Sequence, residues 1–157
     1  MSRLAYQGSD YPDASTKHLE DAVVLNRNGR YDGSAYHAGY VVECALKSVL
    51  QYELAWNPRT GQYDRRKLEQ AEIKFRELSH GLEELAEELG RVQAAATTQT
   101  APYLPRLSAG AEILKWRPSH RYRPVGHHSQ TRAQAMLADA QQVYNRTIGR
   151  MLADQVL

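Results

Sequence analysis

The clearest hydrophobic pattern in the chain lies between Ala35 and Leu50, where apolar side chains recur every three or four residues. At the pitch of an α-helix these positions share one face, which must be buried. The apolar face consists of Ala35, Ala38, Val42, Ala45, Leu46 and Val49. A second stripe on the opposite side consists of Tyr36, Tyr40, Glu43 and Lys47. This stripe predicts either a face that packs against another element or lines a cleft, or a solvated ion pair beside two half-buried tyrosines.

The residues before this central helix predict a shorter helix that packs against it. An irregular arm over residues 1–12 leads into the shorter helix, which Asp13 or Ser15 can cap and which Gly29 can end. Residues 30–33 are expected to form a short turn. Because so short a connection brings consecutive helices side by side, the two helices are predicted to form an antiparallel hairpin.

Two further amphipathic helices are predicted, one from His80 and one from Thr131. The first has a face that we expect to be solvated, formed by Glu83, Glu84, Glu87 and Glu88. The second has a stripe that we expect to be buried, formed by Met136, Ala140, Val143, Tyr144, Thr147, Ile148 and Met151. Residues 57–79 fit either a helix or a loop, and prolines interrupt residues 97–130, with a short helical piece over residues 109–116. Since no segment shows sustained strand alternation, the predicted fold class is all-α.

Length and composition indicate one ordinary globular domain, residues 13–157, after the arm. The 157 residues are 42% hydrophobic, and the net charge is only +2, so nucleic-acid binding would need a local basic patch. The single cysteine, Cys44, excludes an internal disulfide and is expected to be a buried thiol. No segment has the length of a membrane span or the pattern of a secretory signal, so we expect a cytoplasmic protein without a membrane partner.

The segment between Glu112 and Asp139 contains no acidic residue and many basic ones. Its cationic, imidazole and large aromatic side chains are Lys115, Trp116, Arg117, His120, Arg121, Tyr122, Arg123, His127, His128 and Arg132. Most of them precede the last helix, whose N-terminal N–H groups and dipole favour an anion. The segment therefore predicts a phosphate-binding patch. The alternative is a solvated loop whose arginines pair with the glutamate face of the helix that begins at His80.

The histidines of this segment suggest two kinds of chemistry. Zinc binding is disfavoured, because adjacent residues such as His127 and His128 rarely both ligate and no acidic or cysteine ligand lies close in sequence; no metal or other cofactor is expected. In acid–base chemistry, an arginine would hold a phosphate and a neutral imidazole would transfer a proton. Five residues separate Arg121 from His127, and four separate Arg123 from His128.

Several motifs follow one another in a fixed order along the chain. They are residues 21–25, 29–32, 35–47 and 80–89, followed by Trp116 and by Arg121-Tyr122. In content and order they resemble the HEPN domain family of small helical proteins, over residues 13–153. The resemblance implies an up-and-down bundle of four to five helices that forms a homodimer. It also implies a nucleotidyltransferase as partner, in some cases within a toxin–antitoxin pair.

Catalytic members of that family are metal-independent endoribonucleases with an Arg-x4–6-His motif near the start of the last helix. The matching positions here are Arg121, His127 and His128. The resemblance thus favours an RNA-directed protein. Tyr122 and Pro124 stand where catalytic members have a polar residue, so the alternative is a non-catalytic module that binds a nucleotide or a partner. A third interpretation is a structural dimer whose arginines neutralise the glutamate face.

For the first two interpretations, we expect one groove to collect side chains from the central helix and from the basic segment. Besides the catalytic candidates, its substrate-binding residues would be Tyr40, Glu43, Lys47, Trp116, Arg117 and Arg123. Glu43 would orient Arg121 from behind.

Overall fold

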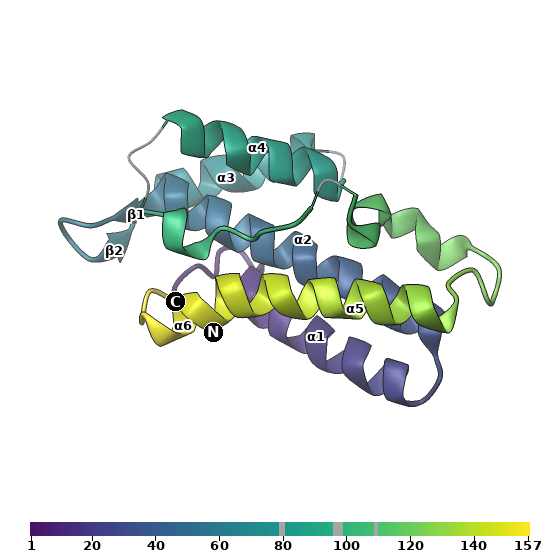
Figure 1. Ribbon diagram of the computed structural model, residues 1–157. Helices are drawn as coiled ribbons and strands as arrows, with labels where there is room; N and C mark the ends of the chain where they lie inside the picture. Colours follow the sequence, from purple (N-terminus) through teal and green to yellow (C-terminus); the bar gives the residue numbers. More distant parts are fainter. Residues whose placement is uncertain (79–80, 96–98, 109) are drawn as a thin grey trace.

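The chain folds as a helical bundle around one long helix, α2 (Tyr31–Ala55). The computed structural model describes residues 1–78, 81–95, 99–108 and 110–157. Its other elements are α1 (Tyr11–Arg27), β1 (Trp56–Asn57), β2 (Gln62–Tyr63), α3 (Arg65–Glu77), α4 (Leu82–Ala95), η1 (Ala101–Tyr103), η2 (Glu112–Lys115), η3 (Pro118–Tyr122), α5 (Gln130–Tyr144), η4 (Asn145–Gly149) and α6 (Arg150–Ala153). Helices α1 and α5 pack on one side of α2, and α3 and α4 pack on the other (Figure 1). The prediction of an all-α bundle of four to five helices is confirmed.

Helix α1 begins earlier than predicted, because Asp10 caps it rather than Asp13 or Ser15. The Asp10 carboxylate accepts the N–H of Asp13 at 3.3 Å, and it also accepts the N–H and hydroxyl of Ser2 at 2.7 and 2.8 Å. The arm is therefore tied to the start of the helix. Ser15, one of the expected caps, is buried and donates its hydroxyl to the carbonyl of Val41 at 3.0 Å.

The connection between α1 and α2 is shorter than the predicted turn over residues 30–33. Gly29 has a φ of +69°, a left-handed conformation that ends α1 within one residue of its cap. Helix α2 can then begin at Tyr31, so most of the expected turn is helical. The predicted antiparallel hairpin is confirmed, and the Ser34 hydroxyl crosses it to the carbonyl of Ala22 at 2.9 Å.

The apolar face of α2 and the Glu43–Lys47 half of its second stripe are enclosed, because helices cover α2 on two sides, whereas Tyr36 and Tyr40 are half-buried. Every residue of the predicted apolar face is fully buried. On the opposite stripe, the Lys47 ammonium donates to the Glu43 carboxylate at 2.7 Å, with side chains only 8% and 4% exposed. The same ammonium lies 5.0 Å from the ring centre of Tyr11 and 5.6 Å from that of Phe75. The packing interpretation is confirmed for this half of the stripe, and the solvated ion pair is wrong.

Residues 57–79, for which the sequence allowed either a helix or a loop, form most of a short hairpin and then a helix. Strands β1 and β2 pair antiparallel, with Trp56 opposite Tyr63. Asp64 then caps α3 by accepting the N–H of Arg66 at 2.9 Å.

The glutamate face of α4 is exposed, as predicted, except at Glu88. That residue is 4% exposed and forms ion pairs with Lys74 of α3 and, at 3.2 Å, with Arg91. The contact with Lys74 comes from another helix, which the spacing within α4 alone does not reveal. Helix α4 begins at Leu82, and the expected start at His80 lies outside the described residues.

The basic segment is only partly helical before the last helix begins. The expected piece over residues 109–116 is the single turn η2, and residue 109 is not described. Helix α5 begins at Gln130, next to the predicted Thr131, and its predicted stripe is buried apart from the half-buried Tyr144.

Candidate functional site

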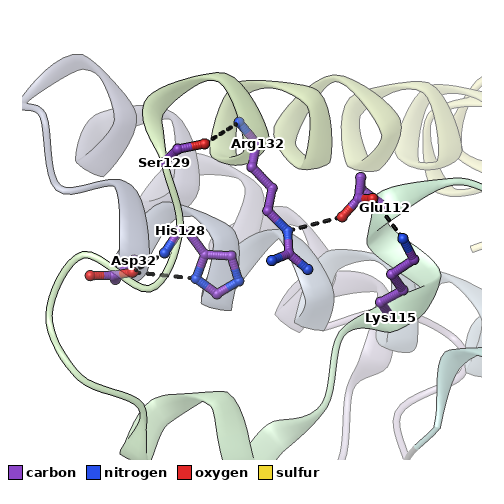
Figure 2. Close-up of polar contacts among 6 residues, drawn as sticks. All are labelled: Asp32, Glu112, Lys115, His128, Ser129 and Arg132. Atoms are coloured by element: carbon purple, nitrogen blue, oxygen red, sulfur yellow. Dashed lines mark hydrogen bonds and ion pairs between the residues drawn. The ribbon is translucent and has the colours of Figure 1, made fainter.

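Asp32, in the first turn of α2, holds the loop that leads into α5 (Figure 2). Its carboxylate accepts the backbone N–H of Gly126 at 2.6 Å and that of His128 at 2.7 Å. Partial burial alone would raise the pKa of Asp32, but these two N–H groups lower it below the ordinary value. Ser129 follows and caps α5 by accepting the N–H of Arg132 at 3.2 Å. The part of the loop next to α5 is thus held by the Asp32 carboxylate and by the Ser129 cap.

This loop gathers three imidazoles, which we call the three-histidine cluster: His120, His127 and His128. The ring centre of His120 lies 5.5 Å from that of His127 and 5.6 Å from that of His128, and the latter two are 4.7 Å apart. His128 is only 4% exposed, and its Nδ1 lies 3.3 Å from Asp32. If Nδ1 carries the proton toward this carboxylate, Nε2 is left as an acceptor.

Two nitrogens of the cluster are buried without a hydrogen-bond partner among the described residues. They are Nδ1 of His120 and Nε2 of His128. Burial lowers the pKa of both residues, and their histidine neighbours and Arg132 lower it further; the hydrogen bond to Asp32 works against this at His128. Both rings are therefore neutral near pH 7, and their unpartnered nitrogens are enclosed within the cluster.

The charges around the cluster favour an anion. The positive charges of Arg123 and Arg132 both contribute to the lowered pKa of His120, after burial and the neighbouring histidines. Arg132 forms an ion pair with Glu112, with its Nε 2.9 Å from a carboxylate oxygen, and Glu112 also accepts a hydrogen bond from Lys115 at 2.8 Å (Figure 2). The Asp32 carboxylate already accepts two backbone N–H groups of the loop, so its negative charge stabilises the loop and does little to attract a cation to the cluster.

Arg121, the predicted phosphate-binding residue, points toward a different set of partners. It is exposed, its guanidinium lies 4.9 Å from the ring centre of Tyr122, and it interacts with the hydroxyl of Tyr36. The Tyr36 hydroxyl is 3.1 Å from that of Tyr40. Among the described residues, Arg121 forms no hydrogen bond or ring contact with a histidine. Although Arg121 and His127 have the spacing of the Arg-x4–6-His motif, the described residues therefore show no contact between Arg121 and the three-histidine cluster within one chain.

Trp116 and Arg117 play parts that differ from those expected of a binding groove. Trp116 is fully buried against Tyr40, with ring centres 4.8 Å apart, and a Cβ at Gly39 would overlap its ring. Arg117 lies 3.4 Å from Glu83 of α4. This is the kind of ion pair that the solvated-loop interpretation predicts, and among the described residues Arg117 is the one arginine of the segment that forms it.

The buried pair of Glu43 and Lys47 lies within the bundle, between α2 and the rings of α1 and α3, so neither side chain is open to solvent. Cys44 beside them is a buried free thiol, as expected, and burial together with Glu43 raises its pKa to about 12. A nucleophilic role needs a low pKa, which this thiol does not have.

Sequence reasoning missed two features of the site. One is Asp32, whose only signal is an acidic residue in a helix first turn. The other is a second group of possible metal ligands on α1 and α2, His18, Asp21 and His37, whose ligand atoms all lie within 4.8 Å of one another. The three-histidine cluster meets the same distance limit, so both groups are close enough to hold an ion.

The fold and the site together define a small α-helical protein with a basic, histidine-rich surface at the start of its last helix. Among the families of known domains, that of the HEPN domain matches residues 9–151. The chain belongs to the HEPN domain family, and the predicted resemblance is confirmed. No curated protein and no solved structure matches the chain. Within its described part, every helix is too short or too polar to cross a membrane.

Proposed function

We propose that this HEPN protein binds RNA at the basic surface before α5 and cleaves it as a metal-independent endoribonuclease. The observation that carries the proposal is the three-histidine cluster, with two unpartnered buried nitrogens beside Arg123 and Arg132. A phosphodiester supplies the negative charge that these cations attract and oxygen atoms that histidine N–H groups can bind.

The exposure of the histidines separates their roles. His127 is half-buried and can reach a substrate, so it would act as acid or base at the ribose 2′-OH. His128 is too deeply buried and is held by Asp32, so it would support the ring of His127 from behind. Arg121 and Arg123 are exposed and would hold the phosphate.

We further propose that the site is completed in a homodimer. The contacts of Arg121 go to tyrosines rather than to a histidine, which favours an arrangement in which Arg121 of one copy faces His127 of the other. A nucleotidyltransferase partner and a toxin–antitoxin pairing rest on the family resemblance alone, and a cytoplasmic location rests on the single buried cysteine and the sequence pattern.

Cleavage of labelled single-stranded RNA and tRNA in EDTA tests the activity. The wild type should cleave, whereas Arg121→Ala and His127→Ala should not. Arg59→Ala, in the exposed turn between β1 and β2, is the matched arginine control and should cleave normally. Equal cleavage by all four proteins would indicate a contaminating nuclease and would remove the proposal.

Mixing the two inactive variants tests the shared site. A heterodimer of Arg121→Ala and His127→Ala chains keeps one intact pairing of arginine and histidine across the interface, so the mixture should regain activity. Mixing would restore nothing if each site used both residues of one chain. Light scattering should give twice the mass of a single chain.

A non-catalytic binding module is the second candidate. The stacking of Arg121 on Tyr122 favours it, because this contact occupies one face of the guanidinium. In that case RNA would bind in a fluorescence anisotropy assay, with loss on Arg123→Gln, and no product would form at any protein concentration.

A further inference from the structure

A second group of histidines lies on the α1–α2 hairpin, and none of its members is among the residues that the proposed function uses. The Tyr36 ring lies between the two sets, because it contacts His37 and its hydroxyl interacts with Arg121. His18 and Asp21 are three residues apart on α1, so they project from the same side of that helix, and His37 faces them from α2. The two Nδ1 atoms of His18 and His37 are 3.0 Å apart. Nδ1 of His37 is 3.7 Å from a carboxylate oxygen of Asp21.

These distances match the spacing of ligands around one small ion. With metal–ligand bonds of about 2.0 to 2.1 Å, the ligands of a tetrahedral zinc ion lie about 3.4 Å from one another. The His18–His37 and His37–Asp21 separations bracket that value, and the ligand atoms of all three residues lie within 4.8 Å of one another, so side-chain rotation would bring them around one ion. Two bare nitrogen lone pairs repel at 3.0 Å, so either a proton or a cation must lie between them.

The two rings are already held in place. The His18 ring stacks on Tyr40, with centres 5.0 Å apart and planes at 21°. The edge of the Tyr36 ring meets the His37 ring, with centres 5.8 Å apart and planes at 84°. Because the ligands project from two packed helices rather than from a loop, little ordering remains to oppose binding.

Charge and exposure also fit a cation. Asp21 provides a carboxylate among the ligands themselves, and the charges of Asp21 and Glu43 both favour a positive species at His18, against one nearby cation, Lys17. An imidazole ligates a metal ion in its neutral form, and both histidines present Nδ1 to the same point. The side chains of His37 and Asp21 are 26% and 45% exposed, which leaves solvent access for a fourth ligand.

We propose that His18, Asp21 and His37 bind a divalent transition-metal ion of the zinc class, with water as the fourth ligand. Two imidazoles and one carboxylate are a ligand set that zinc accepts in proteins, with an open position for an exchangeable molecule. The site goes beyond the proposed RNA function, and neither depends on the other. A bound ion would also link α1 to α2 and stabilise the hairpin.

Zinc titration of untagged full-length protein, first stripped with EDTA and dialysed, tests the proposal. Isothermal calorimetry should show one ion per chain. His37→Asn and Asp21→Asn should each weaken binding about 100-fold or more, because loss of even a supporting residue costs about 10- to 100-fold. Asp21→Asn keeps the shape of a half-exposed side chain, so it remains informative if His37→Asn fails to fold.

The histidine variant His127→Asn is the matched control and should bind zinc like the wild type. Co²⁺ in place of zinc should give the strong visible absorption of a tetrahedral site, and Asp21→Asn should lose it. The proposal is overturned if zinc shows no saturable binding, because the proton-bridged histidine pair is then sufficient. It is equally overturned if His127→Asn abolishes binding while the hairpin variants retain it.

Discussion

Two groups of histidines lie in this small bundle, and their surroundings give them opposite preferences. In the three-histidine cluster, the nearby carboxylate of Asp32 lies behind His128 and is taken up by two backbone N–H groups. Guanidinium groups of Arg123 and Arg132 lie beside the rings. On the α1–α2 hairpin, the carboxylate of Asp21 stands among the ring nitrogens and is half exposed. The first arrangement favours an anion and the second a cation.

The difference teaches that the position of one carboxylate decides what a histidine group binds. A carboxylate that accepts backbone N–H groups orders the loop. The charge near the imidazole rings is then set by the surrounding arginines. An acid at the ligand position neutralises an ion directly. Spacing along the chain does not distinguish these cases, since it does not tell where each carboxylate points.

Among the changes that test this difference, removal of the Asp32 carboxylate should have the largest effect on stability. Asp32→Ala leaves two backbone N–H groups without their acceptor, and hydrogen bonds to a charged group are worth about 1.5 to 3 kcal/mol. Because the carboxylate is partly exposed, we expect a loss of about 2 kcal/mol in the free energy of unfolding, measured by urea denaturation. RNA binding should weaken as well, because the loop that carries the three-histidine cluster loses the hydrogen bonds that hold it in place.

Asp21→Asn is the matched control for that experiment. Within the described part of the chain, Asp21 accepts no backbone N–H, so the variant should unfold like the wild type in the absence of zinc. Asp32→Asn keeps one acceptor oxygen and should lose less stability than Asp32→Ala. Equal stability of the wild type and Asp32→Ala would show that the loop is held by other contacts.

Much of the fold could be predicted from the sequence, because periodicity reports directly on burial. The apolar face of α2 and most of the stripe of α5 are buried as expected. The errors occur where a neighbouring element decides the outcome. Glu88 is buried because Lys74 lies opposite it on α3, and α1 begins early because Asp10 is also bound by Ser2. Such pairings depend on the tertiary arrangement, which a single helix pattern does not contain.

The candidate site was predictable in its composition but not in its arrangement. The basic segment pointed to His127 and His128, and the structure brings them together with His120. The spacing between Arg121 and His127 does not show that Arg121 turns toward Tyr36. His18 and His37 are far apart in sequence, so their pairing appears only once α1 and α2 are packed as a hairpin.

Neutralising one arginine should have an intermediate effect. Arg132→Gln removes a guanidinium beside the cluster, and loss of one charge-assisted contact should weaken RNA binding about tenfold, or about 1.4 kcal/mol. The slope of log affinity against log salt concentration should fall by about 1. Anisotropy titrations over a series of salt concentrations measure both quantities.

Arg150→Gln is the control for Arg132→Gln. Arg150 is also paired with a carboxylate, that of Asp154 at 3.2 Å, but it belongs to α6 rather than to the cluster. Its removal should leave the affinity and the salt slope unchanged. If both variants weaken RNA binding equally, the anion preference belongs to the whole surface rather than to the cluster.

The smallest expected effect, and the most direct contrast between the two groups, is the response of stability to pH. The folded-state pKa is lowered for His18, His37, His120 and His128, chiefly by burial. The unfolded chain therefore binds protons first, and stability that is complete above about pH 6.5 should decline as the pH falls from there toward about 5.

Ligands should change that decline in opposite directions. Zinc needs neutral imidazoles, so saturating zinc should raise Tm most at pH 7 and make the decline steeper, and Asp21→Asn should remove this effect. Phosphate favours protonated imidazoles, so it should raise Tm most at low pH and make the decline shallower, and Arg132→Gln should reduce that effect. The two ligands are tested in separate melting series, because zinc phosphate precipitates. A common response to both would mean that the two histidine groups do not differ in the charge they attract.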